Sequence, residues 1–152
     1  MNIHEFLTSE NIDFETIPHR TTFTASRLAE VVDERGDFVA KPVVLKADGV
    51  FVLAVLPASH KVDMLLARET IGCEVLELAD ESELESLFPD CELGAMPPFG
   101  SFYGLQTWVD AQLAEDDHIV FEGQSHEEAI RLSYSSYQNA EAPLVAYISH
   151  HI

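Results

Sequence analysis

Two apolar runs joined by a short polar turn constrain the fold of this chain more than any other feature. The runs cover residues 37–45 and 50–56, and the four residues Lys46-Ala-Asp-Gly49 separate them. An Asp-Gly step between two apolar runs favours a tight hairpin turn. We therefore expect the two runs to form adjacent antiparallel strands.

Lys41 and Pro42 interrupt the first of these expected strands. Lys41 is one of only three lysines in a chain with 27 acidic residues and a formal charge of −19. A cation in an apolar strand is costly unless an anion meets it, so Lys41 is a candidate functional residue. The alternative is an edge lysine that only discourages strand pairing. Pro42 cannot donate to a neighbouring strand, which predicts an edge or an irregularity at this point.

Helices and strands alternate along the rest of the chain without a strict βαβ order. Helical spacing and capping residues predict helices near residues 3–7, within 19–32, and over 59–71, 80–88 and 134–139. Short apolar segments predict strands near residues 14–17, 74–78, 107–110, 119–121, 129–132 and 144–148. With 152 residues, the chain is expected to be one domain, residues 1–152.

The negative charge restricts the partners of this protein. A polyanionic surface repels nucleic acid, so either the source organism is adapted to salt or no nucleic acid is bound, and the sequence leaves both open. No segment approaches the roughly 18 apolar residues of a membrane span, and the first residues lack a signal-peptide pattern. We therefore expect a cytoplasmic location and no membrane partner.

A glycine- and proline-rich segment over residues 91–100 is predicted to be a shaped loop. Its backbone N–H groups could hold a developing oxyanion, although such a loop can also be a plain structural crossover. Other motifs are weaker. Neither a Walker loop nor a dinucleotide fingerprint is present, the His126-x-Glu128 pair lacks the cysteines of zinc deaminases, and residues 123–127 lack the second glycine of a nucleophile elbow. His126 alone is typical of a surface histidine.

Six segments nevertheless occur in the order found in one protein family. They are Phe23-Thr-Ala-Ser26, Phe38-Val-Ala-Lys-Pro-Val-Val-Leu-Lys46, Val52-Leu-Ala-Val-Leu-Pro-Ala58, Gly94-Ala-Met-Pro-Pro-Phe-Gly100, Trp108-Val-Asp110 and Phe121-Glu-Gly-Gln-Ser-His126. This pattern resembles the YbaK/prolyl-tRNA synthetase-associated domain family, whose members are aminoacyl-tRNA editing domains. The likeness runs from about residue 3 to residue 148. It implies an α+β fold (mixed α/β) in a single domain, with a mostly antiparallel, curved mixed sheet flanked by helices.

The resemblance also implies site residues. The active-site lysine of the family matches Lys41, its pocket-shaping loop matches residues 94–100, and the aspartate that ends the next strand matches Asp110. The histidine of members that edit alanyl-tRNA matches His126, and a threonine-bearing segment matches residues 22–26. We therefore predict Lys41, Gly100 and His126 to be catalytic. The predicted substrate-binding residues are Thr22, Phe23, Thr24, Gly94, Ala95, Met96, Pro97, Pro98, Phe99 and Asp110.

The implied activity is hydrolysis of the ester between a wrong amino acid and the 3′ end of a tRNA. Lys41 would bind the charge of the terminal nucleotide or the oxyanion, amides near Phe99 and Gly100 would complete the oxyanion hole, and His126 and Asp110 would orient the aminoacyl group. No cofactor and no metal are implied. The expected partner is the acceptor end of a mischarged tRNA. Homodimerisation and association with an aminoacyl-tRNA synthetase are left open.

Two features oppose this interpretation. Pro42 stands where the family often has a small polar residue, and the charge of −19 disfavours tRNA binding unless cations form a local rim. The cations considered for such a rim are Lys41, Lys46, Lys61, Arg27, Arg68 and Arg131. One alternative is therefore a catalytically inactive module that binds an amino acid or a tRNA end, with a regulatory role. The other is a hydrolase of small activated esters or thioesters.

Overall fold

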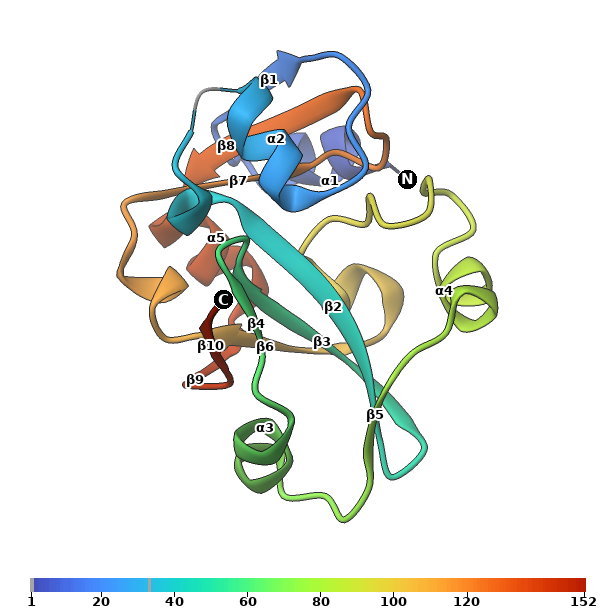
Figure 1. The fold of residues 1–152 in the computed structure, drawn as a ribbon. Helices are drawn as coiled ribbons and strands as arrows, with labels where there is room; N and C mark the ends of the chain where they lie inside the picture. Colours follow the sequence, from blue (N-terminus) through green and yellow to red (C-terminus); the bar gives the residue numbers. More distant parts are fainter. Residues whose placement is uncertain (1, 33) are drawn as a thin grey trace.

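Figure 1 shows the computed structural model of the chain, which describes residues 2–32 and 34–152. The helices are α1 (Ile3–Ser9), α2 (Ala25–Val31), α3 (Met64–Ile71), α4 (Glu81–Leu87) and α5 (Tyr134–Glu141), with short 3-10 turns η1 (Gly36–Phe38), η2 (Gly100–Tyr103) and η3 (Leu113–Glu115). The strands are β1 (Phe14–Pro18), β2 (Ala40–Ala47), β3 (Val50–Pro57), β4 (His60–Val62), β5 (Leu76–Leu78), β6 (Gln106–Asp110), β7 (His118–Glu122), β8 (Glu128–Ser133), β9 (Leu144–Ala146) and β10 (Ser149–His151). No helix in the described ranges is long and apolar enough to cross a membrane.

The strands form three sheets. The largest has the order β5-β2-β3-β6-β9, in which β2 and β3 are antiparallel while β6 runs parallel to both β3 and β9. An antiparallel sheet of order β1-β8-β7 and the pair β10-β4 complete the set. The predicted α+β architecture with a mixed sheet is confirmed, although the strands divide among three sheets.

The hairpin at the centre of the large sheet confirms the strongest prediction from the sequence. The β2/β3 register runs from Ala40 opposite Pro57 to Ala47 opposite Val50. Asp48 (φ 49°) and Gly49 (φ 84°) both take the left-handed conformation that a two-residue type I′ turn requires. On its other side β2 pairs with β5 only from Leu45 onward. Pro42 therefore lies on an open edge of β2, as predicted.

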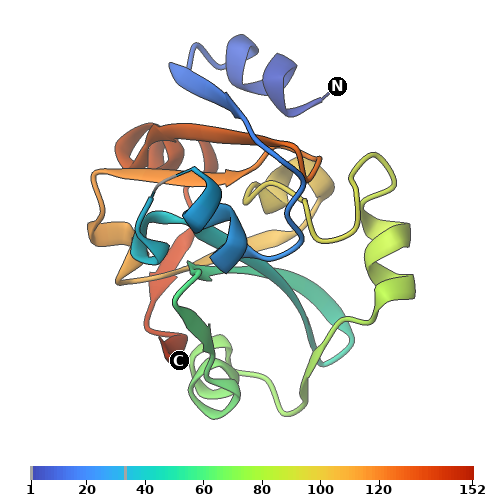
Figure 2. The same cartoon turned by 45° about the horizontal axis from the view of Figure 1, so that its top comes forward.

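Apolar side chains pack on both faces of the large sheet. The main core lies where this sheet meets the three-stranded sheet, and it includes Leu53, Val109, Phe121 and Ile130. A second cluster, with Leu45 and Ala67, lies between the opposite face and α3. Figures 1 and 2 show α2 close to β7 and β8, and its buried Leu28 and Ala29 form a third cluster with Val39, Val120 and Ala129.

Two predicted elements differ from the structure. Residues 59–71 were expected to be one helix, yet the first part is strand β4, and α3 begins after Asp63, whose side chain accepts the N–H of Leu66. Similarly, the strand expected over residues 144–148 divides into β9 and β10. The cause in both cases is the pairing of β4 with β10, which joins Val62 to Ser149 and has no signature in local spacing.

Candidate active site

Three segments that are distant in sequence converge on one hollow beside α2. They are residues 19–24, the loop at 92–95 and the turn at 122–126 after β7. Backbone hydrogen bonds join them: Thr22 N–H donates to the carbonyl of His126 (3.1 Å) and Gln124 N–H to that of Ala95 (3.0 Å). The hollow has a volume of about 280 Å³ and is lined by Phe23, Thr24, Ala25, Leu28, Ala40, Lys41, Pro42, Gly94, Glu122 and His126.

Two local features shape the walls of this hollow. Thr24 begins α2 as its N-cap, because its hydroxyl oxygen accepts the N–H of Arg27 at 3.1 Å. Gly94 has φ of +84°, and a Cβ at this position would lie 3.7 Å from Cε1 of His126. Glycine therefore allows the loop to turn where it passes the imidazole ring.

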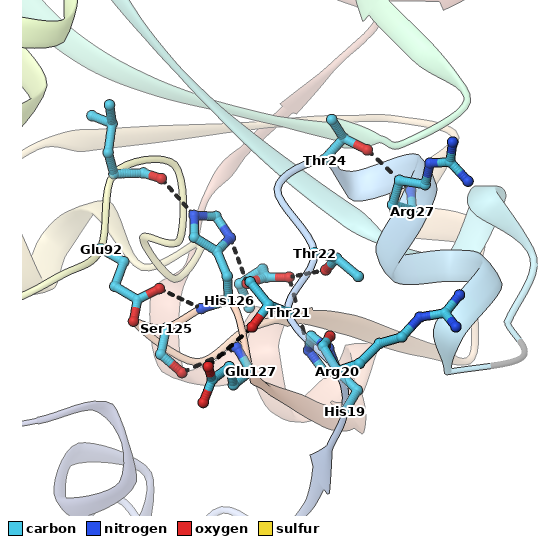
Figure 3. Close-up of polar contacts among 12 residues, drawn as sticks. His19, Arg20, Thr21, Thr22, Thr24, Arg27, Glu92, Ser125, His126 and Glu127 are labelled. Carbon is cyan, nitrogen blue, oxygen red and sulfur yellow. Dashed lines mark hydrogen bonds and ion pairs between the residues drawn. The ribbon is translucent and has the colours of Figure 1, made fainter.

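His126 is fixed from several sides, as Figure 3 shows. Its Nε2 lies 2.6 Å from the carbonyl oxygen of Leu93, and its backbone N–H donates to the carboxylate of Glu92 at 2.9 Å. The ring of Phe23 packs 5.0 Å away, centroid to centroid. Because a carbonyl oxygen only accepts, we assign the Nε2 proton to the bond with Leu93. The other ring nitrogen, Nδ1, then faces Glu122.

Glu122 is a buried carboxylate that sequence reasoning missed. Its Oε2 lies 3.1 Å from Nδ1 of His126, at ion-pair distance but without the alignment of a hydrogen bond, and Thr22 donates to its Oε1 at 3.4 Å. Burial raises the pKa of Glu122 to about 7, and the proximity of His126 opposes this shift. One signal was available, since Glu122 directly follows the apolar run Ile119-Val-Phe121.

Lys41 lies at the border of this hollow. Strand alternation places its side chain on the same face of β2 as Val43 and Leu45. There its ammonium donates to the carbonyl oxygen of His60. In the described part of the chain no carboxylate lies within ion-pair distance of it, and burial lowers the pKa of Lys41. Among the described residues, the cation predicted to need an anionic partner therefore has only a neutral one.

The structure brings five of the predicted site residues together around the hollow: Phe23, Thr24, Lys41, Gly94 and His126. Thr22 contacts the same group through Glu122.

The rest of the 94–100 loop departs from expectation. Residues 95–100 are buried, and Met96 and Phe99 belong to the main core. The amide of Gly100 is already engaged, because it donates to Oγ1 of Thr107 at 2.9 Å. Of this loop only Gly94 lines the hollow, while Ala95, Met96, Pro97, Pro98, Phe99 and Gly100 pack as a buried crossover. The engaged amide of Gly100 does not favour the expected oxyanion hole at Phe99 and Gly100, which stays a prediction.

Asp110 also lies apart from the hollow. Its side chain is fully buried and accepts four hydrogen bonds, from Gln112 N, Ile148 N, Ser149 N and Ser149 Oγ, at 2.7 to 3.1 Å. These bonds fasten β10 to the end of β6. The geometry therefore gives Asp110 a structural position, and its substrate-binding role stays a prediction. No cluster of three or more His, Cys, Asp or Glu within residues 2–32 and 34–152 could hold a metal ion.

Comparison with known proteins identifies the family. A family profile described as "Aminoacyl-tRNA editing domain" matches residues 19–140, which is more than half of the chain. The chain belongs to the aminoacyl-tRNA editing domain family. This confirms the resemblance seen in the sequence, and the converging segments of the hollow all lie within the matched region of the editing domain.

Two curated relatives match part of the editing domain. Proline–tRNA ligase of Bacillus cytotoxicus is 31% identical over 74 residues, which cover 49% of this chain and 13% of the ligase. The Staphylococcus saprophyticus enzyme is 32% identical over 74 residues, covering 49% of this chain and 12% of the ligase. The match therefore spans only a small part of these relatives.

Solved structures share the whole fold of the editing domain. The crystal structure of a hypothetical protein has a TM-score of 0.88 at 17% identity and covers 97% of this chain and 99% of its own. A protein described as a proposed trans-editing enzyme for prolyl tRNA synthetase has a TM-score of 0.85 at 18% identity, with coverage of 97% and 94%. At these identities the likeness shows the fold alone.

Proposed function

We propose that this chain is an aminoacyl-tRNA deacylase that acts in trans on mischarged tRNA. The observation that carries the proposal is the hollow itself. Its lining includes the buried Glu122–His126 pair and, at the border, Lys41, whose ammonium has no carboxylate partner among the described residues. An acceptor of protons beside a group that stabilises negative charge is what ester hydrolysis needs.

In the proposed mechanism the Glu122–His126 pair and Lys41 have different roles. The aminoacyl ester is already activated, so positioning and charge stabilisation supply most of the catalysis. The Glu122–His126 pair would accept a proton from water, whose oxygen attacks the ester carbonyl. Lys41 would stabilise the negative charge on the carbonyl oxygen or on the terminal nucleotide. The ester C–O bond then breaks, and the proton passes to the released 3′ oxygen of the ribose.

The hollow has room for an aminoacyl group between mostly apolar walls. Its volume is about 280 Å³, and its apolar walls are Phe23, Ala25, Leu28, Ala40 and Pro42. Apolar walls discriminate modestly, since one methylene changes binding by roughly 10- to 200-fold. We therefore propose alanine, serine, cysteine and threonine esters as the substrates to compare. Because the curated relatives are proline–tRNA ligases, proline tRNA is the first carrier to use.

The test is amino-acid release from proline tRNA charged with each of these four amino acids. It should be run at low and high salt, because screening reduces the repulsion between tRNA and a chain of charge −19. We expect faster release than in buffer for at least one ester, and a loss of that release in His126→Ala. Ser125→Ala, one residue away and outside the lining of the hollow, is the matched control. If none of the four esters were hydrolysed faster than in buffer, the proposal would be contradicted.

One observation favours a second candidate, a binding module without catalysis. Pro42 lines the hollow beside Lys41 and has no N–H to donate to a substrate. In that case mischarged tRNA or a free amino acid would bind without being hydrolysed. Restoring a donor by Pro42→Thr would then be expected to create deacylation, whereas under the main proposal it only alters an existing rate.

A further inference from the structure

A second hollow lies beside the first, on the face of β2 that carries the Lys41 side chain. It has a volume of about 320 Å³ and is lined by Lys41, Val43, Lys61, Val62, Met64 and Leu78. These residues come from β2, β4, the start of α3 and the end of β5, whose arrangement can be followed in Figure 1. The volume falls at the lower end of the usual range for small-molecule sites, roughly 300–1,000 Å³.

The second hollow brings two cations together in a very acidic chain. Lys46 lies 2.5 Å from a carboxylate oxygen of Glu83, and Arg27, Arg35 and Arg131 also have carboxylate partners. Within the described ranges Lys41, Lys61, Arg20 and Arg68 take part in no ion pair, and of these four only Lys41 and Lys61 line the second hollow. Two unpaired ammonium groups at one site indicate an anionic ligand.

The acidic residue next to β4 forms no ion pair with either lysine. Asp63 follows the β4 strand, but its carboxylate accepts the N–H of Leu66 at 3.1 Å and lies 3.4 Å from Nδ1 of His150. Its charge is therefore directed toward the start of α3 and toward β10.

The other four lining residues are apolar. Val43, Val62, Met64 and Leu78 form the remaining surface, and Leu78 is 61% exposed although it is a large apolar residue. A small inorganic anion would use the lysines and leave this surface in contact with water. A nucleotide has both an anionic phosphate and a flat base that can cover apolar side chains.

Lys41 lines both hollows. A ligand that extends from one to the other must therefore pass this residue. We propose that the second hollow binds the 3′-terminal nucleotide of the tRNA, with its phosphate between Lys41 and Lys61 and its base on Val43, Val62, Met64 and Leu78. The aminoacyl group then enters the first hollow and the ester lies beside Lys41. This inference rests on the proposed deacylase function.

Binding of adenosine 5′-monophosphate (AMP) tests the site without requiring catalysis. Titrations followed by NMR should show AMP binding at least fivefold tighter than inorganic phosphate or adenosine, with shifts in β2, β4 and β5. Lys61→Ala should weaken AMP binding about tenfold. Arg68→Ala removes the same charge from an exposed position on α3 outside the hollow, so it should leave the binding unchanged. Equal binding of AMP and phosphate, or equal losses in both variants, would overturn the proposal.

Kinetics on a mischarged tRNA then assign the nucleotide to the tRNA end. Lys61→Ala should raise KM about five- to tenfold and leave kcat unchanged, since Lys61 is remote from the Glu122–His126 pair. It should also reduce the slope of log affinity against log salt by about 0.7, the value for one phosphate contact with a single strand. AMP binding with an unchanged KM would overturn the assignment to tRNA. AMP binding to a chain that releases no amino acid would instead contradict the deacylase function and leave the nucleotide site standing.

Discussion

Glu122 and His126 lie 3.1 Å apart, from Oε2 to Nδ1, with both side chains almost completely shielded from water. Nε2 of His126 is already engaged with the carbonyl oxygen of Leu93, and Nδ1 faces the carboxylate of Glu122 without the alignment of a hydrogen bond. The hydrogen bonds of His126 with Leu93 and Glu92 tie the turn after β7 to the 92–95 loop. Glu122 also gives the first hollow a titrating group near neutral pH.

The stability of the chain should depend on pH through Glu122. Its pKa is raised from 4.5 to about 7 on folding. Between these values the folded chain holds a proton that the unfolded chain has released, so the free energy of unfolding falls as pH rises through this window. Glu122→Gln removes the ionisation. Between pH 5 and pH 8 we expect the free energy of unfolding of wild type to fall by about 1–2 kcal/mol relative to that of Glu122→Gln, as measured by urea unfolding. Glu115 is an exposed carboxylate in η3, so Glu115→Gln should show the same pH dependence of the unfolding free energy as wild type. If Glu122→Gln also showed that dependence, Glu122 would not be the group responsible.

Gly94→Ala should impair activity beyond its effect on stability. The left-handed backbone, φ +84°, makes alanine unfavourable by about 1 kcal/mol, and the new Cβ would add a van der Waals contact with His126, 3.7 Å from Cε1, at the wall of the first hollow. Gly72 has the same φ of +84° with nothing within 4 Å of its Cβ position, so Gly72→Ala is a matched control. We expect similar losses in the free energy of unfolding but a raised KM for deacylation only in Gly94→Ala. An equal KM in both variants would remove Gly94 from the substrate site.

Asp110→Asn should affect folding and not chemistry. The variant weakens four hydrogen bonds that a buried carboxylate accepts, which costs about 2–4 kcal/mol of unfolding free energy. At a temperature where the variant is folded, the relative rates on the four aminoacyl esters should match wild type within about twofold. If the fully folded variant had a different amino-acid preference from wild type, Asp110 would have a role in substrate binding.

Local patterns in the sequence predicted the parts of the fold that depend on near neighbours. The Asp48-Gly49 turn, the Thr24 cap and the Asp80–Glu83 capping box all use contacts within a few residues, and all three are present. The β4/β10 pair joins strands almost ninety residues apart, so spacing within residues 59–71 could not reveal it.

The sequence identified site residues only where a motif of the family includes the functional side chain itself. Lys41 and His126 were found in this way, and both border the first hollow. The sequence could not reveal that the Gly100 amide donates to Thr107, because that partner is supplied by the next strand. Glu122 and Lys61 were not identified as site residues, since the significance of each comes from elements that meet only in the folded chain. Burial gives Glu122 its pKa, and the meeting of β2 with β4 places Lys61 near Lys41.

The most direct test of the central claim is single-turnover deacylation by Lys41→Ala, with the mischarged tRNA that wild type hydrolyses fastest. Lys46→Ala is the matched control, because Lys46 lies five residues further along β2 and is paired with Glu83 outside both hollows. We predict that Lys41→Ala loses at least about 100-fold in the rate of amino-acid release, as expected for removing a group that stabilises charge in the transition state. Lys46→Ala should stay within about twofold of wild type. Equal rates for Lys41→Ala and wild type would contradict the account.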